Sequence, residues 1–224
     1  MEFNTLSLSL TTIIIIITVG LSIAGFSNQK VIDDLIFYPP AVSKRNQWYR
    51  FITCGFIHAD IAHLAFNMYA FYMFGGAVEV AFKELFQENG KLLYIVLYIS
   101  ALVVCLLPTY FKNRDNYYYR SLGASGAVAA VVFTYIMLDP MQGIGIIFIP
   151  GIYIPAFAFA VIYLGVSAYL DKRGGGSINH SAHFWGSVYG LVFVIIAVYT
   201  LTKYPLLENF VQQVKTWFSS KFGG

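Results

Sequence analysis

Long stretches without a charged residue are the feature that most constrains how this 224-residue chain can fold. No Asp, Glu, Lys or Arg occurs in residues 3–29, 92–111, 144–170 and 174–202. A membrane-spanning helix needs about 20 mostly apolar residues, and each of these stretches reaches that length. Charged residues make up only 11% of the chain, against about 25% in an average soluble domain. The chain is therefore predicted to cross a membrane several times as one compact bundle.

Net charge and cysteine content narrow the functions that such a membrane protein could have. The formal net charge is +3, and no run of Lys or Arg suggests a surface for nucleic acid. Cys54 and Cys105 form no C-x-x-C motif and are predicted to be buried apolar side chains. The N-terminal apolar stretch lacks a basic region and a clear cleavage site, so we expect a retained helix and not a signal peptide. No cofactor, metal or nucleic-acid partner is expected.

The fold class predicted from these patterns is an all-α polytopic membrane protein with a six-helix domain over residues 1–202. The six predicted spans cover about residues 5–26, 60–80, 91–109, 124–138, 154–170 and 181–202. Residues 139–153 are apolar but interrupted by glycine and proline, which predicts a re-entrant or interfacial segment. Residues 203–224 carry apolar side chains at helical spacing and are predicted to form an amphipathic tail on the membrane surface.

The polar residues capable of chemistry are predicted to converge on one rim of this bundle. In a six-span chain, the second, fourth and sixth helices begin on the same side of the membrane. The polar residues near those three starts are His58, His63, Asn67, Ser125, His180 and His183. Reactive side chains inside a membrane domain are functional candidates by default.

Ser125 and His183 have the chemistry of a nucleophile and its base. A serine hydroxyl attacks poorly unless a base removes its proton, and His183 is predicted to be that base. Their helices can approach closely because the facing residues are small. The small residues concerned are Gly123, Gly126, Gly186 and Gly190. No Asp or Glu is placed to orient His183, so we expect a dyad and not a triad.

Donors for an oxyanion are predicted beside the nucleophile. Ser125 opens its helix, where backbone N–H groups have no partner within the helix. His63 and Asn67 are four residues apart and project from one face of the second helix. These groups are predicted to stabilise the tetrahedral intermediate of acyl transfer.

At these residues the chain resembles the rhomboid family of intramembrane serine proteases. The matching segments are His58-Ala-Asp-Ile-Ala-His63-Leu-Ala-Phe-Asn67, Gly75-Gly76-Ala77-Val78-Glu79, Gly123-Ala-Ser125-Gly126 and Ala182-His183-Phe-Trp-Gly186-x3-Gly190. The resemblance implies that Ser125 is the nucleophile and His183 the general base. It also implies an oxyanion hole of His63, Asn67 and the Ser125 backbone, and single-span or polytopic membrane proteins as substrates.

The resemblance assigns supporting roles to several further residues. Tyr49-Arg50 is similar to the Trp-Arg pair of the family's first loop, and Glu79 is expected to anchor helix ends. Many bacterial relatives carry an aromatic residue one turn after the nucleophile, packed on the catalytic histidine, where this chain has Ala129. The candidate replacements are Tyr117 to Tyr119 or Phe133. The fifth span and the Gly174–Gly176 loop are expected to form a gate and a cap.

Two other functions stay open at the level of sequence. One is a non-catalytic rhomboid-like factor that binds membrane proteins through the same lateral opening. The other is a metal-dependent membrane enzyme with the four histidines as ligands. Against the second, the chain has no H-E-x-x-H motif and no predicted role for Ser125 in such a site.

The resemblance implies an integral protein of the bacterial inner membrane, with the active rim on the extracytoplasmic side. The distribution of basic residues favours the reverse orientation. The rim loops carry nine Lys or Arg residues and the opposite side carries five, whereas cytoplasmic loops usually hold the excess. We follow the resemblance, because part of the first loop is embedded in the membrane in that family.

Overall fold

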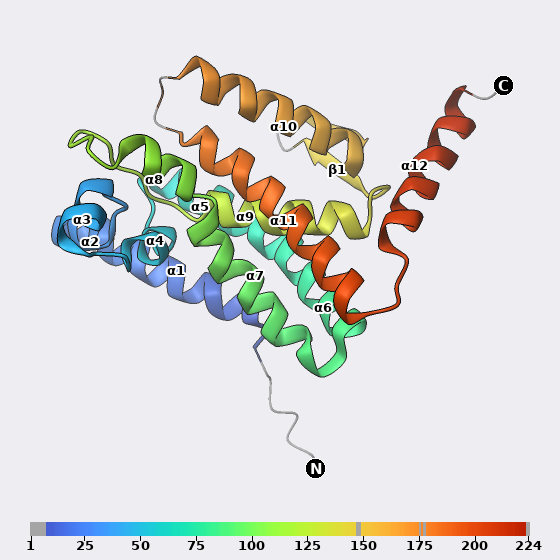
Figure 1. Cartoon of the computed structure of the whole chain (residues 1–224), viewed down its shortest axis with the longest axis horizontal. Coiled ribbons are helices and arrows are strands. Elements are labelled where there is room, and N and C mark those ends of the chain that lie inside the picture. Colours follow the sequence, from blue (N-terminus) through green and yellow to red (C-terminus); the bar gives the residue numbers. More distant parts are fainter. Residues whose placement is uncertain (1–7, 147–148, 175, 177, 223–224) are drawn as a thin grey trace, which may run out of the picture.

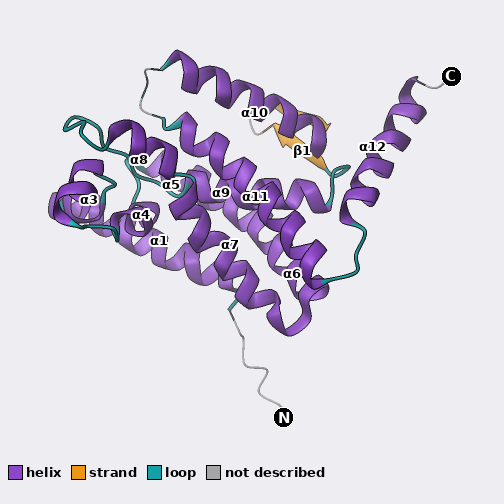
Figure 2. Cartoon of the chain, in the orientation of Figure 1, coloured by secondary structure: helices purple, strands orange, loops and turns teal. Residues whose placement is uncertain are grey.

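The computed structural model describes residues 8–146, 149–174, 176 and 178–222, and it is predominantly helical (Figures 1 and 2). Parts of four predicted segments lie outside the described residues: positions 5–7, 147–148, 175 and 223–224. In chain order the helices are α1 (Leu10–Ser27), α2 (Gln29–Leu35), α3 (Pro39–Arg45), α4 (Arg50–Thr53), η1 (Cys54–Phe56), α5 (Ile61–Ala70), η2 (Phe71–Gly75), α6 (Gly76–Phe86), η3 (Gln87–Asn89), α7 (Gly90–Val104), α8 (Leu107–Asn113), α9 (Ser125–Leu138), α10 (Ala156–Arg173), α11 (His180–Leu201) and α12 (Leu206–Phe222).

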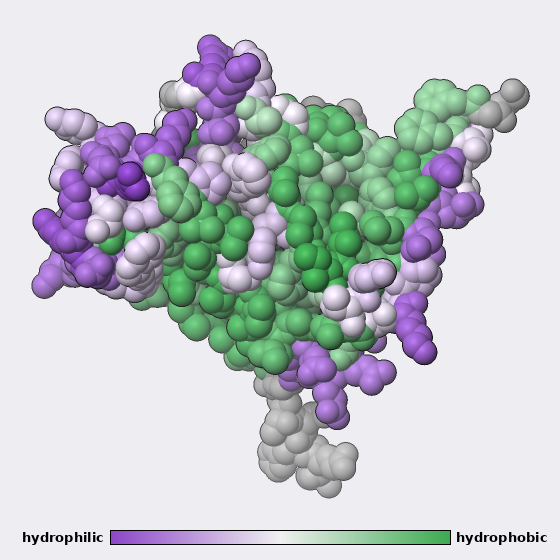
Figure 3. All heavy atoms as spheres, in the orientation of Figure 1, coloured by the Kyte–Doolittle hydropathy of each residue, from purple (hydrophilic) through white to green (hydrophobic). Residues whose placement is uncertain are grey.

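The first helix has the reversed polarity expected of a helix in lipid. The residues that α1 buries are Thr11, Thr18, Ser22 and Gly25. Several of its isoleucines face outward, with Ile16 56% and Ile23 54% exposed, whereas Ile14 and Ile15 are partly buried against the core. In water this arrangement would be costly, but in lipid small residues belong at helix contacts and aliphatic ones at the surface. Figure 3 shows that the middle of the visible face is largely hydrophobic, with hydrophilic residues gathered mainly toward its edges.

Among the described residues, three helical stretches are long and apolar enough to cross a membrane: Leu10–Ser27, Ile61–Asn113 and His180–Leu201. The middle stretch reverses at η3, so α6 and α7 pack side by side (Figure 1). The other two expected spans, α9 and α10, do not meet the requirements of length and composition for a membrane-spanning helix, for different reasons. Helix α9 has only 14 residues, about 21 Å at 1.5 Å per residue. Helix α10 ends in the charged residues Asp171, Lys172 and Arg173.

The short helix α9 lies at the centre of the bundle. Eleven of its residues are buried, from Gly126 to Met137, and it packs against α7, α10 and α11. The hydrocarbon core of a bilayer is about 30 Å thick, so a helix of about 21 Å cannot reach both surfaces.

The segment between α9 and α10 forms a β-hairpin, which differs from the all-α prediction. Strand β1 (Gly143–Ile146) pairs antiparallel with β2 (Ile149–Pro155), and Ile144 lies opposite Ile154. β-Branched residues favour extended backbone, and the glycines between them disfavour a helix. The predicted re-entrant or interfacial segment is therefore a two-stranded sheet over its described residues.

The long loop before the second span contains short helices that are tied to the rest of the rim. An antiparallel bridge joins Phe37 to Ser121, with N–H to O=C distances of 3.0 and 3.1 Å. The guanidinium group of Arg50 is buried and donates from Nη1 to the carbonyl oxygens of Asp33 and Ile36, at 2.9 and 2.7 Å. Arg50 therefore holds the first loop together from inside.

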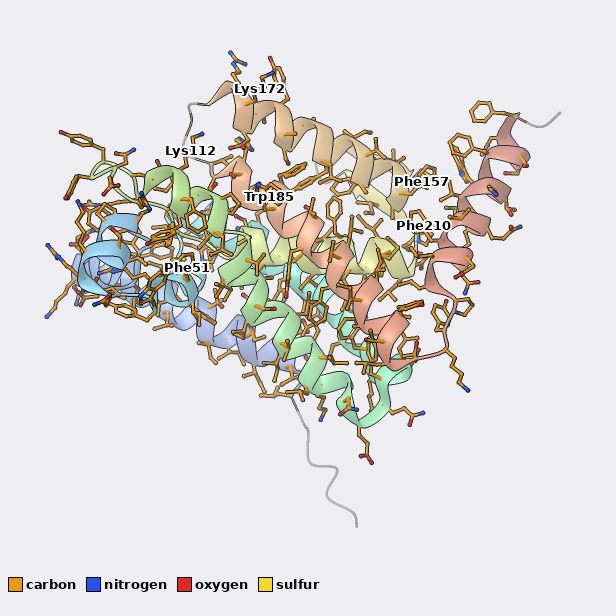
Figure 4. All side chains as sticks on the ribbon, viewed as in Figure 1. Phe51, Lys112, Phe157, Lys172, Trp185 and Phe210 are labelled. Carbon is orange, nitrogen blue, oxygen red and sulfur yellow. The ribbon has the colours of Figure 1, made fainter. Side chains whose placement is uncertain are left out.

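The C-terminal tail is helical over the described residues, as α12. Phe157 at the start of α10 contacts Trp217 and Phe218 of α12, with ring centroids 5.3 and 6.0 Å apart. Figure 4 shows labelled Phe157 and Phe210 in the region where α10 and α12 meet. The apolar side of α12 thus meets the bundle near the hairpin end of α10.

Candidate active site

The hydroxyl of Ser125 and the imidazole of His183 are hydrogen-bonded. Ser125 Oγ and His183 Nε2 are 2.7 Å apart, and both residues are only partly exposed. Ser125 is the first residue of α9, and His183 lies in the first turn of α11. A distance of 2.7 Å lies within the range that direct proton transfer requires.

Glycines set this distance by letting α9 and α11 approach closely. A Cβ atom added at Gly186 would lie 2.1 Å from the carbonyl oxygen of Gly126, and one at Gly190 would lie 2.0 Å from that of Ala130. Both positions therefore exclude any side chain. We call this contact, made by Gly126, Ala130, Gly186 and Gly190, the glycine seam.

His58 supports the segment that precedes the nucleophile. Its Nε2 accepts the backbone N–H of Ala124 at 3.4 Å, which places the ring proton on Nδ1, 3.1 Å from Ser22 Oγ. Burial, together with the nearby His63, lowers the pKa of His58 to about 4. A neutral ring is required for this acceptor role, and that pKa keeps it neutral at physiological pH.

Gly123 fits between the nucleophile and His63. Its φ is +109°, a conformation that side chains disfavour, and its N–H donates to the carbonyl oxygen of Cys54 at 2.9 Å. A Cβ atom there would lie 2.8 Å from His63 Cε1. The imidazole of His63 therefore packs directly on the backbone two residues before Ser125.

Asn67 is buried on α5, the helix that also carries His63. Its side-chain amide is hydrogen-bonded within that helix. Nδ2 of Asn67 donates to the backbone carbonyl oxygen of His63 at 3.0 Å. An amide nitrogen has two hydrogens, so one remains for another acceptor. His63 and Asn67 are thus on one face of α5, as their spacing predicts.

Tyr163 of α10, and none of the residues that the sequence suggested, packs on the candidate base. Its ring lies 6.3 Å from that of His183 at an angle of 26°. Phe133 contacts Tyr163 from behind at 5.6 Å, and Ala129 is buried in the bundle. The sequence placed Tyr163 on the gate helix, but nothing in its spacing indicated which way the ring points.

Asn179 is a further residue whose role the sequence did not reveal. Its Oδ1 caps α11 by accepting the N–H of Ala182 at 3.0 Å and also accepts from Thr109 Oγ1 at 3.2 Å. Its Nδ2 lies 3.5 Å from Ser121 Oγ. Asn179 therefore fixes the start of α11 against both α8 and the loop that leads to Ser125. Asn at an N-cap is a readable signal, but its other contacts are long-range.

The remaining candidate residues lie around or beyond this centre. His180 is edge-on to His183, with ring centroids 5.9 Å apart. Within the described residues, no group of three His, Cys, Asp or Glu side chains is arranged to hold a metal ion. Glu79 does not contact the dyad. It caps α1, where its carboxylate accepts hydrogen bonds from the N–H groups of Leu10 and Thr11 at 2.8 and 2.9 Å.

Comparison with known proteins gives this arrangement its family. The sequence matches the profile of the Rhomboid domain over residues 45–200. The chain belongs to the rhomboid family, and its apolar helices make it an integral membrane protein.

Individual relatives are distant. The chain is similar to RHOMBOID-like protein 12, mitochondrial, of Arabidopsis thaliana, with 28% identity over 64% of this chain and 45% of the relative. It is also similar to the presenilin-associated rhomboid-like protein, mitochondrial, of Homo sapiens, with 27% identity over 75% of this chain and 42% of the relative. Rhomboid protease GlpG of Pectobacterium atrosepticum is 28% identical over 88% of this chain and 64% of the relative. The chain thus spans less than half the length of those two mitochondrial relatives.

These relatives contradict the expected location. The resemblance had suggested the bacterial inner membrane with the active rim on the extracytoplasmic side. Most of the relatives named are mitochondrial proteins. The family alone does not specify which membrane houses a member, and the prediction of a bacterial plasma membrane is wrong on this comparison.

Proposed function

We propose that this chain is an intramembrane serine endopeptidase that uses Ser125 and His183 as a catalytic dyad. The observation that supports it most directly is the 2.7 Å separation of Ser125 Oγ and His183 Nε2. Nε2 accepts the hydroxyl proton as Oγ attacks the scissile carbonyl carbon, and later donates it to the leaving amine. Hydrolysis of the acyl-enzyme by water then repeats the two proton transfers.

The oxyanion of the tetrahedral intermediate would be held by donors beside Ser125. Residues in the first turn of a helix have N–H groups without intrahelical acceptors, and the helix dipole favours negative charge there. His63, which packs on Gly123, and the second amide hydrogen of Asn67 would complete the hole. Each such donor typically contributes about 10²–10³ in rate.

The proposed catalytic domain is a six-pass bundle over residues 1–202, with an amphipathic tail over residues 203–224. Helices α9 and α10 would be the two passes that length and composition alone do not identify. Because α9 is too short to span the bilayer, Ser125 would lie below the headgroups and reach water through a recess. His63, Asn67 and Ser181 would line that recess, whereas the side chain of His58 is fully buried.

The proposed substrates are single-span or polytopic membrane proteins. A peptide bond inside a helix is shielded because every carbonyl is hydrogen-bonded and lipid offers no replacement partner. The substrate helix must therefore unwind locally before attack. Substrates with Gly or Pro near the cleaved bond should be preferred because their helices open more easily.

Reconstitution with a model one-span substrate tests this function. Ser125→Ala and His183→Ala should each reduce cleavage by several orders of magnitude, while the thermal unfolding of the protein changes little. The matched control is Ser187→Ala, the same substitution in α11, because Ser187 Oγ donates only to the carbonyl oxygen of His183 at 2.8 Å. Full cleavage by either dyad variant would refute the proposal.

A serine-directed phosphonate separates the protease from a non-catalytic binding factor. The activated hydroxyl of a Ser–His pair should become labelled, and Ser125→Ala should abolish the label. A protein that binds substrate but takes no label at Ser125 would belong to the non-catalytic class.

The names of the mitochondrial relatives favour a mitochondrial membrane as the location. Fractionation of the source cells with antibody detection tests this assignment. Recovery of the protein outside the mitochondrial fraction would refute it.

A further inference from the structure

A cavity enclosed by three arginines lies in the first loop, outside the dyad. Its volume is about 290 Å³, and its walls include Asp33, Ile36, Tyr38, Arg45, Arg50 and Arg120. These residues come from α2, the residues between α2 and α3, α3, α4 and the segment before α9. Helices α2, α3 and α4 lie at the hydrophilic end of the view in Figure 3. None of the cavity residues has a role in the proposed hydrolysis.

The cavity has an excess of positive charge. Three guanidinium groups and one carboxylate give a formal surplus of two positive charges, three minus one. Asp33 is exposed, and its Oδ1 already accepts from Gln29 Nε2 at 3.1 Å. The ion pairs found among the described residues are made by Lys44, Arg114 and Asp115. Among the described residues, the arginines of the cavity thus form no ion pair with a carboxylate.

Two of the three arginines, Arg50 and Arg120, make contacts that hold their guanidinium groups in place. Arg50 uses Nε and Nη1 for Gln47 Oε1 and two backbone carbonyls, which leaves the two hydrogens of Nη2. Arg120 lies over the ring of Tyr38, 5.3 Å from its centroid. A fixed guanidinium group presents parallel N–H donors that match the oxygens of a phosphate group.

From this arrangement we infer that the cavity binds the phosphate of an anionic phospholipid headgroup. The bridge between Phe37 and Ser121 places the cavity beside the rim of a membrane domain. On the same loop, Trp48 and Tyr49 are exposed, 54% and 47%, as aromatic residues at the membrane interface usually are. A headgroup phosphate is the anion present at that depth in high local concentration.

Binding there would act on the segment that carries Ser125. Ile36 and Tyr38 line the cavity on either side of Phe37, and Arg120 precedes Ser121. Because Phe37 and Ser121 are paired through two backbone hydrogen bonds, a phosphate shared by Arg45, Arg50 and Arg120 would tie the two sides of this bridge together. The segment from Ser121 to Ser125 would then be held more firmly. This second step rests on the proposed protease function, whereas the binding step does not.

The binding step is tested by native mass spectrometry of the purified full chain titrated with phosphatidylglycerol or phosphatidylcholine. The test variant is Arg45→Gln/Arg120→Gln, and the control is Lys112→Gln/Lys172→Gln. The control removes the same charge toward the same end of the molecule (Figure 4) and outside the cavity. The affinity of the test variant for phosphatidylglycerol should fall by about tenfold or more, and that of the control by less than about twofold.

Three results would overturn the inference. One is an unchanged affinity of the test variant, and another is an equal loss in the control, which would indicate general surface charge. The third is binding of inorganic phosphate as tight as that of phosphatidylglycerol, which would assign the cavity to a soluble anion. If the double variant fails to fold by thermal unfolding, Arg45→Gln and Arg120→Gln are measured singly, each with a loss of about threefold expected.

The second step is tested by cleavage of the one-span substrate in nanodiscs with and without phosphatidylglycerol. Wild type should cleave faster with the anionic lipid, and Arg45→Gln/Arg120→Gln should show equal rates in both. Equal rates in wild type would overturn the coupling. Lipid binding without any cleavage in wild type would instead refute the protease function and leave the phosphate site standing.

Discussion

Helices α10 and α11 both pack beside α9, but in different ways. At the glycine seam, α11 lies so close to α9 that a single added carbon at Gly190 would overlap a backbone carbonyl. Along α10, in contrast, an added carbon at Gly165 would meet nothing within 4 Å. Several large side chains of α10 face outward, with Val161 70% and Tyr169 63% exposed.

The difference separates a fixed part of the site from an adjustable one. Backbone contacts at the seam set the distance between Ser125 and His183, because backbone atoms cannot rotate away as side chains can. Helix α10 contributes one aromatic ring to His183, from Tyr163. The hydrogen-bonded pair of Ser125 and His183 is thus positioned by α9 and α11, and Tyr163 of α10 packs on it.

The largest expected effect compares one substitution at two places. Gly190→Ala should destabilise the protein by about 3 kcal/mol because the new methyl group meets the carbonyl of Ala130. Gly165→Ala should instead be neutral or stabilising by about 0.5–1 kcal/mol, since it only improves helix propensity. Thermal unfolding in detergent measures both. Equal effects would show that the two contacts do not differ.

A smaller effect is expected from pH through His58, which supports the start of α9. Its pKa is lowered to about 4 in the folded protein, against about 6.5 when unfolded. Between these values the unfolded chain binds more protons, so stability falls as the pH drops from 6.5 toward 4. The loss over this range should be no more than about 3 kcal/mol.

Unfolding measured at several pH values checks this expectation. His58→Phe should make that part of the profile less steep, and His180→Phe, the same substitution at a histidine of α11, is the control. If His58→Phe left the profile unchanged, His58 would not contribute to the pH dependence of stability.

The smallest expected effect concerns the ring of Tyr163. Tyr163→Ala should lower kcat about three- to tenfold, because an aromatic contact of this kind contributes about 0.5–1.5 kcal/mol to holding His183 in place. Tyr163→Phe keeps the ring and should retain activity. Tyr169→Ala, an exposed position of the same helix, is the control. A loss in Tyr163→Phe as large as in Tyr163→Ala would mean that the hydroxyl matters and not the ring.

Sequence reasoning succeeded where spacing alone decides the outcome. The glycine spacing of α11 and the position of Ser125 after Gly123 predicted that α9 and α11 pack closely and that Ser125 lies at the start of α9. It failed where a contact depends on how distant segments turn toward each other. The contact of Tyr163 with His183, the contacts of Asn179 with Thr109 and Ser121, and the bridge of Phe37 to Ser121 join residues far apart in sequence. The β-hairpin was missed because its apolar residues are equally consistent with an interfacial segment.

The hairpin between α9 and α10 has a mechanical consequence. Backbone N–H groups of Ala156 and Phe157 donate to the carbonyl oxygens of Gln142 and Pro140 at 3.0 and 3.1 Å, which attaches the first turn of α10 to the far end of α9. Any swing of α10 must therefore pivot at that end, and its amplitude increases toward Arg173. The widest separation between α10 and α11 would arise beside the start of α11. A substrate helix that entered there would contact Ser125 and His183 before it contacted the rest of the bundle.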